Sequence, residues 1–477
     1  MFIQASDARS WRKCKRRVWF DNNPPADFVE TEAGEFEQLI IENGNCLEKK
    51  YLEQFKQTLT VVEATSQEHT KALMKDGVDV IYQGIFIKEN IIGKPDFLIR
   101  QSSGAYQPAD VKLAHDADKI EIQTQLGVYR FLMETKLPAL AYLATGEIME
   151  IGDEANEKVS AYLASMQEIL GAKTPPVARF SESKCRECPY QTICKPEFES
   201  KGELTLLYGL ESRAAPGLEE QGYKDIKKLS VADPENIADV PFLKGHEKKQ
   251  RIVLQAQSYM DGNFRQLSEI TLPGGTWIHF DIEDYPLTES GQKHVYLWGF
   301  LKPNYDRADF DYIWTDAEAS DRDGWEQFLA QVSEYGGQYP DLILAHFSHH
   351  EKTTIELYAK RYDMESHPVV TWLLGDESPL FDIQKPVKES LVLPIAGYGL
   401  KYICKHPNLV NFQWHEADSG SQWSIVQFAR YLEEGAQGRA RLKQSILDYN
   451  FDDVLATRKL ELWLRALPNE FASIQAA

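Results

Sequence analysis

The sequence predicts two α/β domains joined by a small helical connector. Residues 1–200 and 271–477 combine strand-like apolar runs with amphipathic helical stretches, whereas residues 201–270 carry short helical stretches without strand patterning. In the second α/β block the strand-like runs come first and helices then alternate with them. At 477 residues the chain also exceeds what one hydrophobic core usually organises. We expect the domain boundaries at these positions.

The composition is that of a globular protein, with 43% hydrophobic and 26% charged residues. No run of about 18 apolar residues occurs, and the N-terminal MFIQASDARSW lacks the apolar core of a signal peptide. We therefore expect a cytoplasmic protein without a membrane partner. The formal charge of -21 argues against coating nucleic acid through the overall field. The basic segment 9–17, RSWRKCKRR, could still bind a phosphate backbone locally. A solvated helix face explains this cluster of basic residues equally well.

Helical patterning dominates residues 7–75. Residues 78–101 alternate and are rich in Val, Ile, Phe and Tyr, which predicts two strands joined by a turn at Glu89 and Asn90. A third strand is expected at YQPADVKLA, followed by a helix over about 119–135, a strand at LPALAYLAT and a helix at NEKVSAYLASMQEIL. In the second block, strands are expected at GGTWIHFDIEDYP, HVYLWGFLKP, FDYIWTD and LILAHFS.

Three of the six cysteines form a tight C-x2-C-x5-C group: Cys185, Cys188 and Cys194. A low cysteine content and a reducing compartment favour metal ligation over disulfides for such a group. Three thiolates do not close a four-coordinate site, so a fourth ligand is required. Cys46 and Cys404 stand alone and are expected to be small buried apolar residues.

A first set of chemically suggestive residues lies in GKPDFLIRQSSGAYQPADVKLA. Asp110 and Lys112 are two apart on a predicted strand and project from one face, and Asp96 begins the strand before it. An acid beside a lysine can be an ordinary surface pair. Two neighbouring carboxylates, however, repel unless a divalent cation neutralises them. Such a cation would activate water while the lysine offsets developing negative charge.

These residues resemble the PD-(D/E)xK nucleases of the RecB-like branch, whose fold is restriction-endonuclease-like. Pro95, Asp96, Asp110 and Lys112 match the Pro-Asp, spacer, acid-x-Lys pattern. Downstream, Gln125 and Tyr129 in QLGVY match the Q-x-x-x-Y element of that branch. Upstream, GNCLEKKYL resembles the helix that supplies a further metal ligand, with Leu47 where His is expected and Glu48 retained. The resemblance implies Mg²⁺ or Mn²⁺ held by Glu48, Asp96 and Asp110.

Several RecB-like nucleases bind an iron-sulfur cluster with one cysteine before the nuclease core and three after it. Cys14 in KCKRRVW, together with Cys185, Cys188 and Cys194, is similar to that arrangement. The resemblance implies a [4Fe-4S] cluster that ties the first helix to the end of the domain. Four thiolates also suit zinc, but the long separation of the first ligand from the other three favours the cluster over a local zinc ribbon.

A second carboxylate set begins with Asp281 and Glu283 on one face of the strand IHFDIEDYP. This resembles the first motif of the DEDD exonucleases, which have a ribonuclease H-like fold. Glu351 would supply the third acid, where related domains more often carry Asp, and Asp453 the fourth. Tyr449 lies four residues before Asp453 and would orient the attacking water; this spacing selects Asp453 over Asp452. The four acids would hold two cations, although a ribonuclease H-like domain with a decayed site is the alternative.

Both resemblances in this order are similar to the RecB-like nucleases that carry a C-terminal YprB-type ribonuclease H-like domain. They imply a nuclease that acts on DNA in repair, recombination or defence. Two alternatives remain: a non-catalytic nucleic-acid adaptor for a partner helicase, and an RNA-processing exonuclease. No Gly-x4-Gly-Lys-[Ser/Thr] loop occurs in the chain, so we expect no ATP-driven motor within it.

Overall fold

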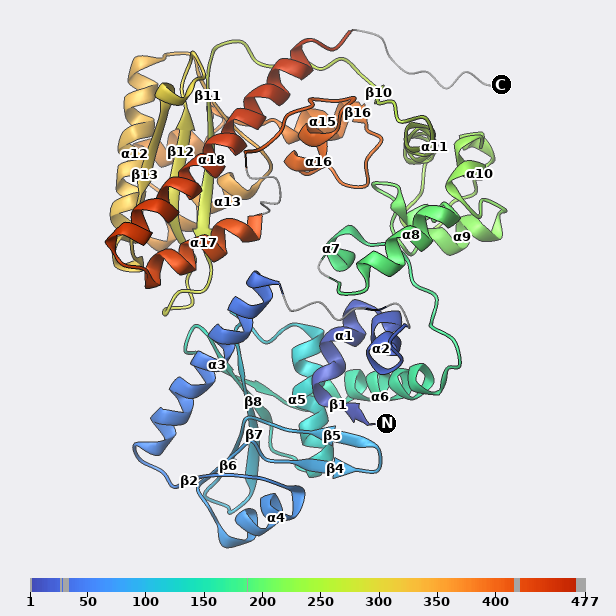
Figure 1. Cartoon of the computed structure of the whole chain (residues 1–477), viewed down its shortest axis with the longest axis vertical. Helices are drawn as coiled ribbons and strands as arrows, with labels where there is room; N and C mark the ends of the chain where they lie inside the picture. The colour runs from blue at the N-terminus through green and yellow to red at the C-terminus, as the bar shows by residue number, and fades with distance from the viewer. Residues whose placement is uncertain (1, 26–27, 29–33, 187, 416–420, 469–477) are drawn as a thin grey trace. The chain divides into compact units, whose positions relative to one another are not determined.

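The computed structural model describes residues 2–25, 28, 34–186, 188–415 and 421–468. It contains two compact units (Figure 1). The first consists of Met1–Ala178, Arg186–Ile193 and Pro286–Gln292. The second consists of Arg179–Cys185, Cys194–Tyr285 and Lys293–Ala477.

The first unit is built on a mixed six-stranded sheet in the order β2-β3-β6-β7-β8-β9. Its strands are β2 (Val61–Glu63), β3 (Val80–Tyr82), β6 (Phe97–Arg100), β7 (Tyr106–Lys112), β8 (Ala139–Leu143) and β9 (Ile148–Ile151). A small sheet of β1 (Ile3–Gln4), β5 (Ile91–Gly93) and β4 (Phe86–Lys88) accompanies it. β6 and β7 are antiparallel, whereas β7 and β8 are parallel, with α5 in the connection between them.

The helices of this unit are α1 (Ala8–Lys13), α2 (Lys15–Asn22), α3 (Glu35–Lys56), α4 (Gln67–Asp76), α5 (Ile120–Met133) and α6 (Asn156–Gly171). Two separate apolar clusters pack on the sheet. In one, Leu126 of α5 packs with Leu98 and Ala141 of the strands. In the other, Phe55 of α3 packs on Phe97 and Tyr142. The sheet is therefore covered by α3 and α5 through different side chains.

Three predictions for the first block are wrong in detail. Residues 78–101 form four short strands, β3 to β6, rather than two, and the turn at Glu89–Asn90 joins β4 to β5. Gln83 causes one break because its φ of 55° takes the backbone out of the extended region. The helical prediction for residues 7–75 missed β2, and β9 was not predicted at all.

The connector region of the second unit contains α9 (Ala215–Glu220), α10 (Ile226–Ser230) and α11 (His246–Asp261). Two short helices precede them along the chain, α7 (Glu182–Cys185) and α8 (Gln191–Lys201). Contrary to the prediction of no strands within residues 201–270, β10 (Arg265–Gln266) pairs with β16 (Leu391–Val392). A strand of two residues is too short to leave an alternating pattern in the sequence.

The remainder of the second unit surrounds a five-stranded sheet in the order β13-β12-β11-β14-β15. The strands are β11 (Thr276–Tyr285), β12 (His294–Leu301), β13 (Phe310–Trp314), β14 (Leu342–His346) and β15 (Leu380–Asp382). The helices are α12 (Asp321–Gln338), α13 (His350–Arg361), α14 (Pro368–Leu374), α15 (Gln384–Ser390), α16 (Leu400–Lys405), α17 (Ser421–Glu433) and α18 (Ala436–Arg465). β11 runs antiparallel to β12 and parallel to β14.

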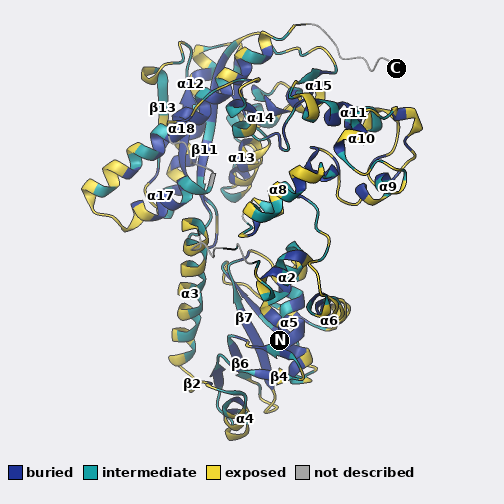
Figure 2. Cartoon of the chain, turned by 45° about the vertical axis from the view of Figure 1, so that its right-hand side comes forward, coloured by how far each residue is buried: buried dark blue, intermediate teal, exposed yellow. Residues whose placement is uncertain are grey.

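The core of this unit is aromatic. Trp298, Trp325 and Phe328 have no exposed surface, and the Trp298 and Phe328 ring centroids lie 4.2 Å apart. Figure 2 shows the largely buried strand β11 beside helices that expose one side to solvent. The long helix α18 contacts β11 and β12. This contact brings late residues of the chain to the strand that carries Asp281 and Glu283.

Candidate active sites

The first candidate site lies where β6 and β7 pair. Phe97 is opposite Ala109 in this antiparallel pair, so Asp96 and Asp110 are neighbours at the start of β6. The backbone N–H of Asp96 donates to Oδ1 of Asp110 over 3.2 Å, and the N–H of Val111 donates to Oδ2 of Asp96 over 2.8 Å. The strand pairing itself thus brings the two predicted carboxylates together.

Lys112 and Gln125 complete one side of this site. Nζ of Lys112 lies 2.5 Å from Oδ2 of Asp110 and donates to Oε1 of Gln125 over 2.9 Å. Gln125 on α5 in turn donates through Nε2 to Asp110 over 3.1 Å and to the Tyr129 hydroxyl over 2.7 Å. The glutamine carboxamide therefore connects the lysine, the aspartate and the tyrosine.

Glu48 of α3 reaches the site through residues that the sequence motifs do not include. Its Oε1 accepts hydrogen bonds from the Tyr82 hydroxyl over 2.7 Å and from Nε2 of Gln83 over 2.6 Å. Nε2 of Gln83 also lies 3.3 Å from Oδ1 of Asp96. Gln83 is thus a bridge between two predicted metal ligands, and no local pattern in the sequence marks it.

The electrostatics of the first site fit a cation. Burial, with the nearby charges of Asp110 and Glu48, raises the pKa of Asp96 well above its usual value. Burial raises the pKa of Tyr129, and the two aspartates add to the effect. Carboxylates that disfavour each other's charge in this way are stabilised by a divalent ion among them.

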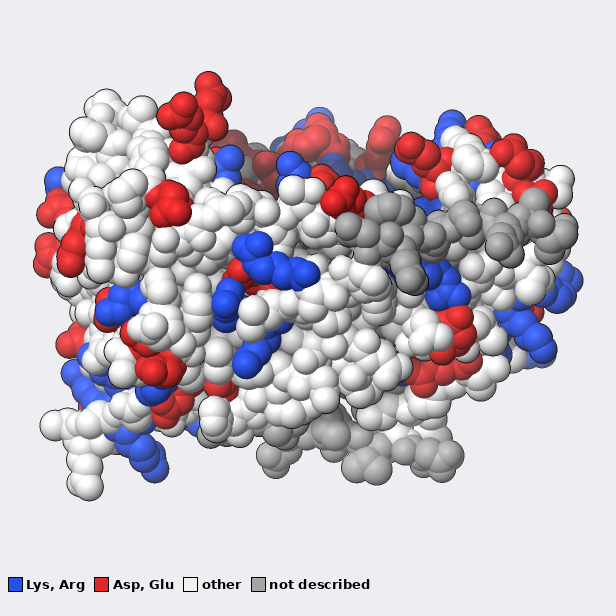
Figure 3. Space-filling model, turned by 90° about the horizontal axis from the view of Figure 1, so that it is seen from above, with Lys and Arg blue, Asp and Glu red and all other residues white. Residues whose placement is uncertain are grey.

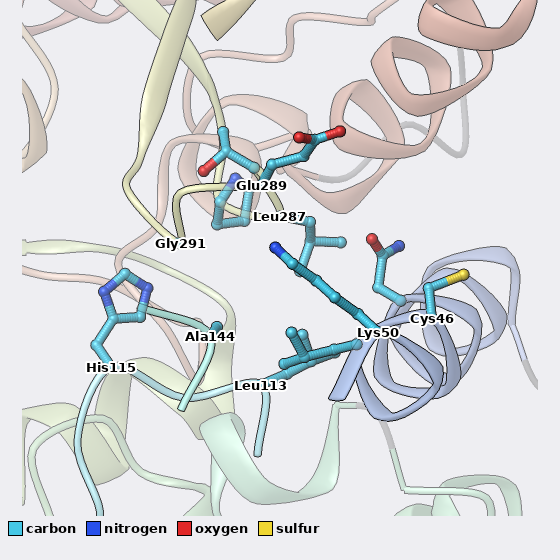
Figure 4. A pocket seen from close by; sticks show the side chains of 12 residues that line it. Cys46, Lys50, Leu113, His115, Ala144, Leu287, Glu289 and Gly291 are labelled. Atoms are coloured by element: carbon cyan, nitrogen blue, oxygen red, sulfur yellow. The ribbon is translucent and has the colours of Figure 1, made fainter. Parts of the chain in front are cut away.

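A pocket in the first unit lies beside these elements. Figure 4 shows Cys46 and Lys50 of α3 around it, with Leu113 and His115, which follow β7. Lys50 lies two residues beyond Glu48, and Leu113 directly follows Lys112. The segments that supply the predicted catalytic residues therefore also line an accessible hollow.

The second candidate site is an acidic cluster on β11 and α18. Asp281 and Glu283 are two residues apart on β11, so their side chains project from the same face of the strand. Asp453 of α18 lies next to both of them. Each of the three residues offers a carboxylate oxygen, and these oxygens lie within 4.8 Å of one another. Oxygen ligands at such spacing suit Mg²⁺ or Mn²⁺.

Three neighbouring side chains donate hydrogen bonds to the acids. Ser424 donates to Oε2 of Glu283 over 2.5 Å, and Nδ2 of Asn450 donates to Oδ2 of Asp281 over 2.8 Å. Nε1 of Trp414 donates to Oδ1 of Asp453 over 2.6 Å. Sequence reasoning missed all three. Only Asn450 gave a positional signal, because it directly follows Tyr449.

The other predicted residues of this site lie close to the cluster. Glu351, in the first turn of α13, is close enough to Asp281 for its charge to raise the pKa of that acid, and its Oε2 lies 3.2 Å from Nδ1 of His346. The Tyr449 hydroxyl accepts a hydrogen bond from Nζ of Lys401 over 2.9 Å, and Tyr449 lies one helical turn before Asp453 on α18.

Asp452 has a different partner from Asp453. Its Oδ1 lies 2.8 Å from Nδ1 of His415. His415 and Asp452, together with Tyr449 and Arg307, line a pocket in this unit. Asp452 and Asp453 thus lie in different environments: Asp453 belongs to the acidic cluster, and Asp452 contacts His415.

Burial dominates the electrostatics of the second site. It raises the pKa of Glu283 to about 8, with the charge of Asp453 adding to the effect. Burial likewise raises the pKa of Asp281 well above its usual value, and the charges of Glu283, Asp453 and Glu351 contribute. The pKa of Asp453 is also raised by burial. The residues present therefore fit a divalent cation both in ligand chemistry and in charge.

The cysteines divide between the two compact units. Cys14, between α1 and α2, and Cys188 belong to the first unit, whereas Cys185 and Cys194 belong to the second. Burial raises the pKa of the Cys188 thiol, and Cys14 is near enough to contribute. The prediction that both isolated cysteines are buried is correct for Cys404 and wrong for Cys46, which is exposed on α3.

The face drawn in Figure 3 carries acidic and basic side chains interspersed, and no broad basic area covers its described residues. Every helix in the described part of the chain is too short or too polar to span a bilayer. Contacts with a polyanion would therefore have to be local on this face rather than spread over it.

Two family models agree with this architecture. Residues 5–195 match a model of the PD-(D/E)XK nuclease superfamily, and residues 278–465 match a model of the RNase_H superfamily. A solved structure titled "Crystal structure of SSO0001" is similar at 14% identity and a TM-score of 0.25, over 41% of this chain and 86% of that chain. A search of curated proteins gives no match.

The fold class predicted from the sequence is confirmed. The chain has an α/β architecture in which a PD-(D/E)XK-type nuclease domain is followed by a ribonuclease H-like domain. Domains of these two superfamilies are typically metal-dependent nucleases.

Proposed function

We propose that this protein is a metal-dependent nuclease that hydrolyses phosphodiester bonds of nucleic acid, with DNA as the expected substrate. The observation that carries the proposal is the convergence of Asp281, Glu283 and Asp453, whose oxygens lie within 4.8 Å of one another. A bound Mg²⁺ or Mn²⁺ would supply an activated water and neutralise charge on the phosphate and the leaving oxygen.

In the first site, Asp96, Asp110 and Glu48 would hold the cation. Lys112 would place its ammonium beside the charge that develops on the phosphate. Gln125 keeps that ammonium next to Asp110 through its two hydrogen bonds, and it anchors the Tyr129 hydroxyl. This division of roles makes Lys112 dispensable for metal binding and necessary for cleavage.

In the second site, Asp281, Glu283, Glu351 and Asp453 would hold cations, and Tyr449 would orient the attacking water. Ser424, Asn450 and Trp414 keep three of these acids in place by donating hydrogen bonds to them. These donors leave Oδ1 of Asp281 and Oδ2 of Asp453 available to a cation, so the site is compatible with an active exonuclease-like centre.

A [4Fe-4S] cluster bound by Cys14, Cys185, Cys188 and Cys194 is part of this proposal. The proximity of Cys14 to Cys188 supports it, as does the hydrogen bond of 3.0 Å from the Tyr190 hydroxyl to Asp21 on α2. Soft thiolate ligands suit iron-sulfur clusters. We assign the cluster a structural role. We also propose that the protein is cytoplasmic and that a helicase is a candidate partner.

The test is a cleavage assay with labelled single- and double-stranded DNA and RNA, in Mg²⁺, Mn²⁺ or EDTA. Three variants are compared with the parent: Lys112→Ala, Asp281→Ala and the double variant. If both sites are active, each single variant retains part of the activity and the double variant none. Preference for RNA would favour the RNA-processing alternative.

Two other outcomes would revise the proposal. Binding without cleavage in any metal would favour an adaptor that serves a partner helicase. Unchanged cleavage by the double variant would refute both residue assignments. Circular dichroism of each variant controls for folding, because truncating a partly exposed lysine seldom costs more than about 1 kcal/mol of stability.

A further inference from the structure

Lys401 lies beside the acidic cluster of the second unit but belongs to none of the acid motifs. It is on the short helix α16, and its Nζ donates to the Tyr449 hydroxyl over 2.9 Å. The same ammonium lies 4.3 Å from the centroid of the Tyr449 ring. Lys401 therefore touches the residue expected to orient water in this site.

The second aromatic neighbour of Lys401 is Trp414, whose ring centroid lies 5.4 Å from Nζ. Trp414 and Tyr449 both lie next to Asp453, because Trp414 donates a hydrogen bond to this acid and Tyr449 precedes it by one turn of α18. The lysine is thus in contact with both aromatic side chains beside one predicted metal ligand. Cation–π contacts of this kind fix ring positions most effectively where the cation is partly desolvated.

The charge environment also ties Lys401 to the acids. Burial lowers the pKa of its ammonium, while Asp453, Glu283 and Asp281 oppose that effect. A lysine that only covered an aromatic surface would need no such acids. Lys443 on α18 provides a contrast: it lies over the Tyr312 and Trp314 rings at 5.4 and 5.0 Å, and its acidic neighbour, Asp316, is not part of the acidic cluster.

We propose that Lys401 is a positioning residue of the second active site, which fixes the Tyr449 ring and holds Trp414 in the orientation in which Trp414 binds Asp453. This inference rests on the proposed nuclease function of that site. Through the two rings, Lys401 sets the position of a metal-ligating carboxylate that it does not itself bind. Residues that orient metal ligands typically change metal affinity or activity about 10- to 100-fold when they are replaced.

The test uses the full-length protein with Asp110→Asn, which removes a metal ligand of the first site. On this background, Lys401→Met, Lys401→Arg and Lys443→Met are compared for kcat, KM and Mn²⁺ affinity, the last by calorimetry. We expect Lys401→Met to lower kcat about tenfold or more with little change in KM, and to weaken Mn²⁺ binding. Lys401→Arg should restore most of both losses, and Lys443→Met should match the parent.

The direction of the Mn²⁺ change is decisive. Removing a positive charge next to the acids would by itself tighten cation binding, so weaker binding indicates lost positioning of Asp453. Unchanged or tighter Mn²⁺ binding by Lys401→Met would overturn the inference. Tyr449→Phe provides a second route if Lys401→Met does not fold: it removes the hydroxyl that accepts the hydrogen bond from Lys401 and should also weaken Mn²⁺ binding.

The double variant Lys401→Met/Tyr449→Phe tests whether Lys401 acts through Tyr449 or acts on the site independently of it. Because Lys401 acts through Tyr449 and Trp414, its loss should cost much less in the presence of Tyr449→Phe than alone. Equal losses in both contexts would contradict the inference. If the Asp110→Asn parent cleaves nothing, and Asp281→Ala does not alter Mn²⁺ binding, the proposed function of this site fails instead. If the parent binds Mn²⁺ through Asp281 without cleaving, the affinity measurement alone decides the role of Lys401.

Discussion

Gly299 of β12 leaves the space that the Asn450 side chain occupies. Gly299 lies opposite Asp281 in the pairing of β11 with β12, and a Cβ at this position would come within 1.8 Å of Oδ1 of Asn450. Asn450 uses that space to donate a hydrogen bond to Asp281 over 2.8 Å. The absence of one side chain on the neighbouring strand thus allows the amide contact with a predicted metal ligand.

Gly299→Ala should therefore displace Asn450 and damage the second site. We expect a loss of about 1–3 kcal/mol in the free energy of unfolding, as for other overpacked interiors, together with weaker Mn²⁺ binding at this site. Urea unfolding and calorimetry measure the two effects. Gly337→Ala on α12 is the control, because nothing lies within 4 Å of the added Cβ. Wild-type stability and Mn²⁺ affinity in Gly299→Ala would show that the contact is unimportant.

The acidic cluster predicts a pH-dependent stability of the metal-free protein. Burial raises the pKa of Glu283 from its ordinary 4.5 to about 8, so the folded state binds more protons than the unfolded state between these values. The stability contributed by this group is complete below pH 4.5 and is lost as the pH rises through about 8. The melting temperature in EDTA should fall over this range in differential scanning calorimetry.

Metal addition should reverse this trend, since cations and protons compete for the same carboxylates. MgCl2 should raise the melting temperature more at pH 8.5 than at pH 6, an expectation that follows from the raised pKa of Glu283, about 8. Glu283→Gln should flatten the pH dependence in EDTA and reduce the effect of MgCl2. An equal effect of MgCl2 at both pH values would argue against cation binding by these acids.

We expect the Gln83 side chain to influence metal binding and cleavage at the first site. We expect its backbone conformation to influence the free energy of unfolding. Its φ of 55° favours glycine, whereas its amide bridges Glu48 and Asp96. We expect Gln83→Gly to be more stable than Gln83→Ala by about 1 kcal/mol. Both should reduce cleavage and Mn²⁺ affinity by about tenfold or more when Asp281→Ala disables the second site. Full activity in either variant would show that Glu48 and Asp96 need no bridge.

The cysteine assignment predicts a coloured protein. Anaerobically purified protein should be brown and contain iron, since iron-thiolate clusters absorb visible light and zinc does not. Cys14→Ser and Cys188→Ser should lose iron and stability to a similar degree. Cys46→Ser is the matched control, because Cys46 is exposed on α3 and outside the assigned set. Stoichiometric zinc without iron, or full iron content in Cys14→Ser, would refute the assignment.

The sequence alone was sufficient to predict the two α/β blocks and the acids that the folded chain brings near one another. Asp110 and Lys112, or Asp281 and Glu283, are two apart on strands, and Tyr449 and Asp453 are four apart on a helix. Such pairs share a face because of the periodicity of the backbone, which acts over a few residues. Short strands were predicted less well, because β2, β9 and β10 are too short to show periodicity.

Only the tertiary structure decided which side chains support those acids. Gln83 reaches Glu48 from 35 positions away, and Ser424 reaches Glu283 from 141 positions away. Lys401 reaches Tyr449 across 48 positions. No local periodicity relates such residues, because their proximity comes from sheet pairing and helix packing. Asp281 and Glu283 were predictable together because they share one strand, whereas the residues that donate to them come from separate elements that meet only in the folded chain.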